Sequence, residues 1–100
     1  MQIGIVKGTV VSTSKAEKLL GLKLLLVKPI SIETREEKGD VVVAVDAVGA
    51  GEGEVVLLVA GSSSRQTIVT ENKPVDQSII AIIDHIDLNG ERIFEKYSAK

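Results

Sequence analysis

Short runs of branched apolar residues alternate with turn-forming residues along the chain. Val and Ile dominate these runs, and their β-branched side chains favour extended backbone. Apolar runs of this length, bounded by Gly, Pro, Asn and Ser, are typical of an all-β domain. The pattern predicts five strands, at about residues 2–12, 23–30, 40–48, 54–60 and 78–84.

The dipeptide Asn89-Gly90 predicts a hairpin that follows these strands. Both central residues of a type I′ turn need positive φ, which Asn and Gly tolerate best. The dipeptide is flanked by apolar residues at Ile86, Leu88, Ile93 and Phe94.

Two segments carry helix-start signals. Serines follow Gly61 and can cap a turn or two of helix, which predicts a short helix over 61–66. Residues 14–17 resemble a capping box, and Gly21 is suited to end such a helix. This second segment is so short that helix and loop both remain open.

The apolar runs at 24–27, 41–45, 55–60 and 79–83 are continuous. Because successive side chains of a strand point to opposite faces, both faces of these strands are apolar. A single barrel covers only the inner face, and no long amphipathic helix is expected to cover the outer one. The pattern therefore predicts an oligomer with an apolar interface between identical subunits.

Composition narrows the function classes. With 100 residues the chain forms one domain, and a net charge of −2 argues against general nucleic-acid binding. It contains no Cys and one His, which excludes thiolate metal sites and multi-His sites within one chain. No apolar stretch reaches the roughly 18 residues of a membrane helix, and no secretory signal is visible, so a cytoplasmic protein is expected.

The segment Gly49-Ala50-Gly51-Glu52-Gly53 resembles a phosphate-binding loop at first sight. A dinucleotide fingerprint requires a helix to begin at those glycines, whereas a strand is predicted here. The loop is better explained as a tight connection, where backbones approach closely or neighbouring subunits meet near a symmetry axis.

Ser62, Ser63 and Arg65 form a second candidate site. Backbone N–H groups at a helix start and a guanidinium suit an anion. The favoured interpretation is that the serines cap the helix and that Arg65 pairs with a carboxylate, such as Asp46 or Asp84, across an interface.

Catalysis and ligand binding remain as competing hypotheses. His85 and Asp87 alternate on one strand, so a small hydrolase is conceivable, but no nucleophile elbow accompanies them and a surface His is favoured. A small barrel could instead bind an anionic ligand or single-stranded nucleic acid. Two aromatic residues and a negative net charge argue against that function.

The sequence resembles the EutN/CcmL family of pentameric vertex proteins of bacterial microcompartment shells. The resemblance covers nearly the whole chain, and the block at 44–51 followed by the one at 61–65 is specific in combination. The segments that carry it are IVKGTVVST at 5–13, GLKLLLVKP at 21–29, AVDAVGAGEGE at 44–54, GSSSR at 61–65, PVD at 74–76 and AIID at 81–84.

The resemblance implies a five-stranded barrel of the oligonucleotide-binding type, assembled into a homopentamer that caps shell vertices beside hexameric shell proteins. It implies a structural protein without catalysis, cofactor, metal, nucleic-acid or membrane partner, located in the shell in the cytoplasm. A metabolosome and a carboxysome both stay open, and the match favours a catabolic metabolosome. The candidate interface or pore residues are Asp46, Gly49, Gly51, Glu52, Gly53, Ser62, Ser63 and Arg65, and residues 31–39 are expected to meet the hexamers.

Overall fold

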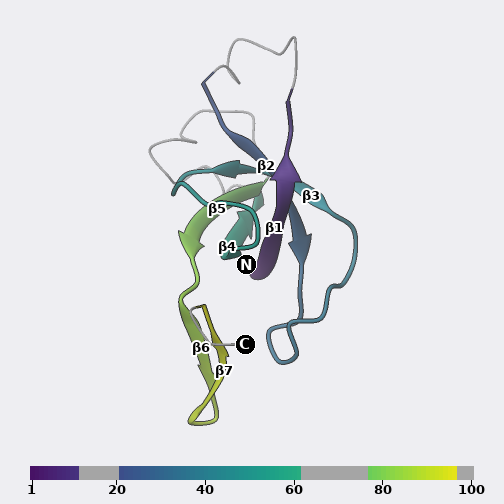
Figure 1. Cartoon of the computed structure of the whole chain (residues 1–100). Coiled ribbons are helices and arrows are strands. Elements are labelled where there is room, and N and C mark those ends of the chain that lie inside the picture. Colours follow the sequence, from purple (N-terminus) through teal and green to yellow (C-terminus); the bar gives the residue numbers. More distant parts are fainter. Residues whose placement is uncertain (12–20, 62–76, 97–100) are drawn as a thin grey trace.

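The computed structural model describes residues 1–11, 21–61 and 77–96, and the regular elements within them are strands. Five strands close into a barrel, and two more form a separate hairpin (Figure 1). The all-β prediction and the five-stranded barrel are confirmed. The strands are β1 (Gln2–Thr9), β2 (Leu24–Pro29), β3 (Val42–Asp46), β4 (Val55–Ala60), β5 (Gln77–Ile82), β6 (His85–Leu88) and β7 (Glu91–Glu95).

The barrel follows the order β1-β2-β3-β5-β4, and β4 closes it against β1. Neighbouring strands are antiparallel except β3 and β5, which run parallel. β3 and β5 pair only at Val45–Ser78 and Asp46–Ile79, so the barrel is closed there over a short stretch.

The barrel interior is filled by aliphatic side chains from all five strands. Leu25 and Val27 point inward from β2, as period-two alternation requires. Gly4 of β1 lies against Val27, where no room for a side chain remains. The buried members of this core are Val6, Leu25, Val27, Ala44, Ala50, Val56, Leu58 and Ile79.

The observed strands are shorter than several of the predicted ones. The first ends at Thr9, and the third spans Val42–Asp46 where 40–48 was predicted. The reason for the second difference is local: the backbone after Asp46 folds back to donate hydrogen bonds to the Asp46 carboxylate. The predicted fifth strand is shifted by a residue or two and spans Gln77–Ile82.

The predicted hairpin is present. Asn89 and Gly90 have φ of 55° and 79°, and β6 pairs with β7 around them. The inner end of the hairpin packs on the barrel, because Ile86 and Phe94 contact a second apolar cluster centred on Ile3, Ile30 and Val55.

The outer face of the barrel carries apolar residues, as the sequence predicted. Leu24 lies opposite Val45, and Leu26 opposite Val43, on the neighbouring strands β2 and β3. Val43 is 49% exposed, and Val41, two residues earlier, is 46% exposed. We call Val41 and Val43 the valine strip.

Both predicted helical segments fall on residues outside the described part of the chain, apart from Gly61 and Gly21 at their ends. The part of the chain that the structure describes contains no candidate membrane-spanning helix.

Candidate functional site

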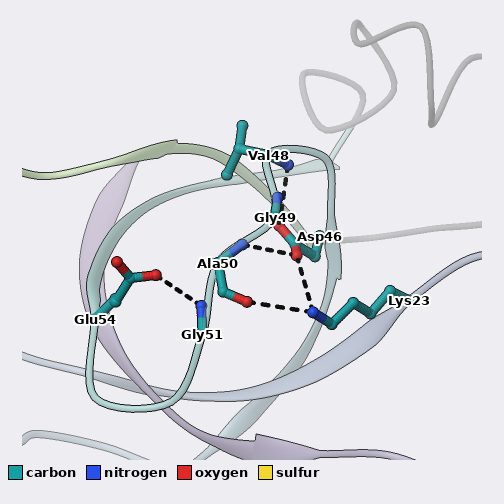
Figure 2. A network of polar contacts seen from close by, with 7 residues as sticks. All are labelled: Lys23, Asp46, Val48, Gly49, Ala50, Gly51 and Glu54. Carbon is teal, nitrogen blue, oxygen red and sulfur yellow. Dashed lines mark hydrogen bonds and ion pairs between the residues drawn. The ribbon is translucent and has the colours of Figure 1, made fainter.

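The candidate site is the loop between β3 and β4, which is organised by the carboxylate of Asp46. Its Oδ1 accepts hydrogen bonds from the N–H groups of Val48 and Gly49, both at 3.0 Å. Its Oδ2 accepts one from the N–H of Ala50 at 2.9 Å. Figure 2 shows the three donors converging on this side chain, which is 1% exposed. An Asp at a strand end that binds the following backbone holds the turn in one conformation.

Lys23 joins this network from the segment that precedes β2. Its Nζ lies 3.8 Å from Oδ2 of Asp46 and 3.4 Å from the carbonyl oxygen of Ala50 (Figure 2). The backbone N–H of Asp46 also donates to the carbonyl of Lys23 at 2.9 Å. A buried carboxylate is costly unless it is hydrogen-bonded and paired, and here both conditions are met.

Glu54 organises the second half of the loop. Its Oε1 accepts a hydrogen bond from the N–H of Gly51 at 2.7 Å, and its Oε2 lies 2.7 Å from Nζ of Lys96. The hydrogen bond from Lys96, followed by that from Gly51, lowers the pKa of Glu54 below its usual value. The backbones of Gly53 and Glu54 also bond to Val6 of β1. The loop is therefore fixed to the barrel at both ends.

This geometry explains the glycine-rich segment as a structural loop. The N–H groups of residues 48–50, which a phosphate would need, point at the Asp46 carboxylate instead. The segment leads into strand β4 rather than a helix. Gly49 and Gly53 have φ of 80° and 87°, a conformation that glycine adopts at little cost.

The structure brings part of the predicted residue set together. Asp46 contacts Gly49 directly, and Gly51, Glu52 and Gly53 lie exposed in the same loop. Ser62, Ser63 and Arg65 lie outside the described residues. The role of these residues at a subunit interface or pore stays a prediction. The Asp46 carboxylate is already hydrogen-bonded within its own subunit.

Sequence reasoning missed Lys23, Glu54 and Lys96. No short-range pattern marks them, because Lys23 and Asp46 are brought together by the pairing of β2 with β3. Lys96 reaches Glu54 because β7 returns the chain from the turn of the hairpin to the barrel.

His85 and Asp87 lie on the exposed face of β6. Nε2 of His85 is 4.0 Å from Oδ2 of Asp87, while Nε of Arg92 donates to Oδ1 of Asp87 at 2.9 Å. The hydrogen bond from Arg92 lowers the pKa of Asp87. All three side chains are about half exposed, which fits the surface-His interpretation. Across the described ranges, no cluster of three His, Cys, Asp or Glu residues could hold a metal ion.

The loop at 31–40 forms a second ordered surface. Nζ of Lys7 lies 2.5 Å from Glu37, and this contact lowers the pKa of the Glu37 carboxyl. Nζ of Lys28 donates to the carbonyl of Gly39, and Arg35 donates to the carbonyls of Ile32 and Glu33. The loop is thus held against β1 and β2 while Ile32 remains 49% exposed.

Comparison with known proteins defines the class. Residues 1–84 match the family described as "Ethanolamine utilisation protein EutN/carboxysome". The chain is 41% identical to the microcompartment shell vertex protein EutN of Salmonella typhimurium over 96 residues, covering 96% of each protein. It is 44% identical to the carboxysome shell vertex protein CcmL of Nostoc sp. PCC 7120, covering 96% of this chain and 95% of that protein.

Solved structures give the same result. The structure of CcmL from Gloeobacter violaceus superposes with a TM-score of 0.91 at 41% identity, covering 98% of this chain and all of that one. The pentameric microcompartment shell protein GrpN from Rhodospirillum rubrum matches with a TM-score of 0.79 at 43% identity, covering 88% of this chain and 99% of that one. The chain belongs to the EutN/CcmL family.

Relatives from both kinds of shell are similar to this chain, so the expected preference for a catabolic metabolosome stays a prediction. The carboxysome protein of Nostoc is 44% identical to this chain and the Salmonella EutN protein 41%. The two groups overlap, because EutN of Escherichia coli is 42% identical to this chain and CcmL of Synechococcus elongatus 40%.

Proposed function

We propose that this chain is a single-domain structural protein that forms homopentamers and caps the vertices of a bacterial microcompartment shell. The observation that carries the proposal is similarity along almost the whole chain to proteins named shell vertex proteins, one of them pentameric in its solved structure. The shell lies in the bacterial cytoplasm, and the protein acts there without catalysis.

Features of the subunit support assembly. The valine strip leaves two large apolar side chains about half exposed, on a face that the barrel cannot cover. In a cyclic ring, one patch of each subunit meets a different patch of the next. Burying such a strip in a ring interface removes its apolar area from water, which favours association.

The glycine-rich loop supports a position near the ring axis. Glu52 and its glycine neighbours are exposed, and a side chain at Gly51 would meet only Glu54 at an ordinary 3.7 Å. Small residues allow five copies to approach closely, and the Asp46 and Glu54 networks hold each copy of the loop in one conformation.

The outer rim must contact hexameric shell proteins, and the loop at 31–40 has suitable properties for that contact. It is polar and charged, it carries exposed Ile32, and the Lys7–Glu37 pair fixes its shape. A polar contact with one apolar anchor is typical of a weaker, reversible interface.

Co-production with hexameric shell proteins tests the function. Closed polyhedral shells should form when this chain is present, and open or elongated assemblies when it is absent. Replacement of Ile32 by Asp should lower incorporation of the pentamer into shells while leaving its native mass unchanged. Closed shells of equal number and shape without this chain would contradict the vertex function.

The competing function is a binding module for an anionic ligand or single-stranded nucleic acid. A labelled oligonucleotide whose mobility shifts in a salt-sensitive manner would support it. The net charge of −2 gives no electrostatic basis for such binding.

A further inference from the structure

One face of the hairpin β6–β7 is mostly apolar, with exposed Glu91 opposite Leu88 at its outer end and Ile93 at a bulge, and the other face is polar. Along β6 the exposed residues His85 and Asp87 alternate with the partly buried residues Ile86 and Leu88. On β7 the partly buried residues are Ile93 and Phe94. An amphipathic hairpin of this kind needs a surface against which its apolar face can pack, because an isolated two-stranded hairpin is marginally stable in water.

The barrel of the same subunit supplies that surface only for the inner half of the hairpin. Ile86 and Phe94 pack against the cluster of Ile3, Ile30 and Val55. Leu88 and Ile93 belong to none of the apolar clusters that the described residues form. Figure 1 shows that the hairpin projects away from the barrel, with the turn between β6 and β7 at its far end.

The direction of the hairpin is fixed at its base. The N–H of Ile83 donates to the carbonyl of Val55 at 2.8 Å, and the N–H of Lys96 donates to that of Asp84 at 2.7 Å. The ion pair between Lys96 and Glu54 connects the end of β7 to the loop before β4. The hairpin is therefore held as a projecting arm.

The same chain carries a separate apolar surface that could receive this arm. The valine strip lies on the outer face at β3 and is nearly half exposed. A projecting apolar element and a distinct apolar receiving surface on one chain are the two halves of a heterologous contact.

We propose that the hairpin β6–β7 is an intersubunit arm, which packs Leu88 and Ile93 against the valine strip of the next copy of this chain. This inference rests on the proposed homopentamer and assigns one of its contacts. It also accounts for two otherwise unrelated features, the exposed valines of the barrel and the apolar outer half of the hairpin.

The test compares the full-length chain with the double variant Leu88→Lys and Ile93→Lys by native mass spectrometry over a dilution series. The variant should need at least tenfold more protein to remain half assembled, while its far-ultraviolet circular dichroism stays that of the parent. Glu95→Lys is the matched control, because Glu95 is exposed and lies opposite His85 on the polar face of the same hairpin, so this variant should assemble like the parent.

A crosslink identifies the receiving surface. The chain has no Cys, so Leu88→Cys with Val43→Cys creates the only two thiols in each subunit. A short bifunctional thiol reagent should yield a covalent ladder up to five subunits, and neither single variant should extend beyond dimers. Half-dissociation of the double lysine variant at the same protein concentration as the parent, or a thiol pair that yields no ladder from intact pentamers, would overturn the arm. A monomeric parent would overturn the proposed function instead.

A variant that keeps its pentamer but fails to enter shells would also overturn the arm, since it would assign Leu88 and Ile93 to a hexamer contact.

Discussion

Nζ of Lys96 lies 2.7 Å from Oε2 of Glu54, and this ion pair connects the end of the hairpin to the glycine-rich loop. The other carboxylate oxygen of Glu54 accepts the N–H of Gly51. One side chain thus holds both the loop expected near the ring axis and the hairpin proposed to reach the next subunit. Both partners are about three-quarters buried, so solvent screens the pair less than a fully exposed one.

Replacement of Glu54 by Gln should make the melting temperature less dependent on pH in the acidic range. In the folded chain, Lys96 and Gly51 lower the pKa of Glu54 below its usual value of 4.5. The stabilisation is therefore complete above that value and is lost as pH falls through the lower folded pKa. The melting temperature of Glu54→Gln should lie a few degrees below that of the parent at pH 7, and the gap should close below about pH 4.5.

The control for this prediction is Glu33→Gln, since Glu33 is exposed and lies outside the glycine-rich loop. It should follow the parent at every pH. A gap between Glu54→Gln and the parent that stays constant from pH 7 to pH 3 would show that the effect is not electrostatic.

Replacement of Asp46 by Asn should destabilise the subunit. Asn has the same shape, but its NH₂ group would face either the N–H of Ala50 or those of Val48 and Gly49. A buried donor left without an acceptor costs about 1–3 kcal/mol. Urea unfolding should show this loss, whereas Asp40→Asn at an exposed position should not. Equal urea midpoints for the parent and Asp46→Asn would show that the hydrogen bonds to the Asp46 carboxylate do not stabilise the subunit.

The sequence was sufficient for the barrel strands and for the hairpin. The β-branched runs mark the strands, and Asn89-Gly90 marks a turn with two positive φ values. It also indicated that apolar side chains would remain outside the barrel, and Val41 and Val43 do so.

The loop contacts could not be predicted in the same way. The Asp46 carboxylate accepts three hydrogen bonds because the backbone of residues 47–50 turns back after β3. Other backbone conformations of this segment would point these N–H groups away from the carboxylate. The position of Lys96 depends on hairpin packing, and so does its pairing with Glu54. Long-range contacts of single charged residues leave no periodic signal in the chain.

Replacement of Gly4 by Ala should destabilise the barrel itself. An added Cβ would lie 2.6 Å from Cγ1 of Val27 and 2.9 Å from the carbonyl oxygen of Lys28, which is backbone and cannot rotate away. Overpacking of this kind costs about 1–3 kcal/mol. The melting temperature should fall accordingly, while Gly51→Ala, with ordinary contacts, serves as the control. A parental melting temperature for Gly4→Ala would mean that β1 and β2 separate at little cost.

Replacement of Gly51 by Trp separates folding from assembly. The position is exposed in the subunit, so the subunit should fold and retain its circular dichroism. Five indole rings near a common axis would crowd, so the ring should fail to close and smaller species should appear in light scattering. Normal pentamers from this variant would place the loop away from the axis.

The most direct test of the account is the native mass of the unmodified chain in solution. Native mass spectrometry should give a species near five times the subunit mass of 10.6 kDa. A stable monomer at micromolar concentration would contradict the account, because the exposed valines and the outer half of the hairpin would then have no partner in a ring.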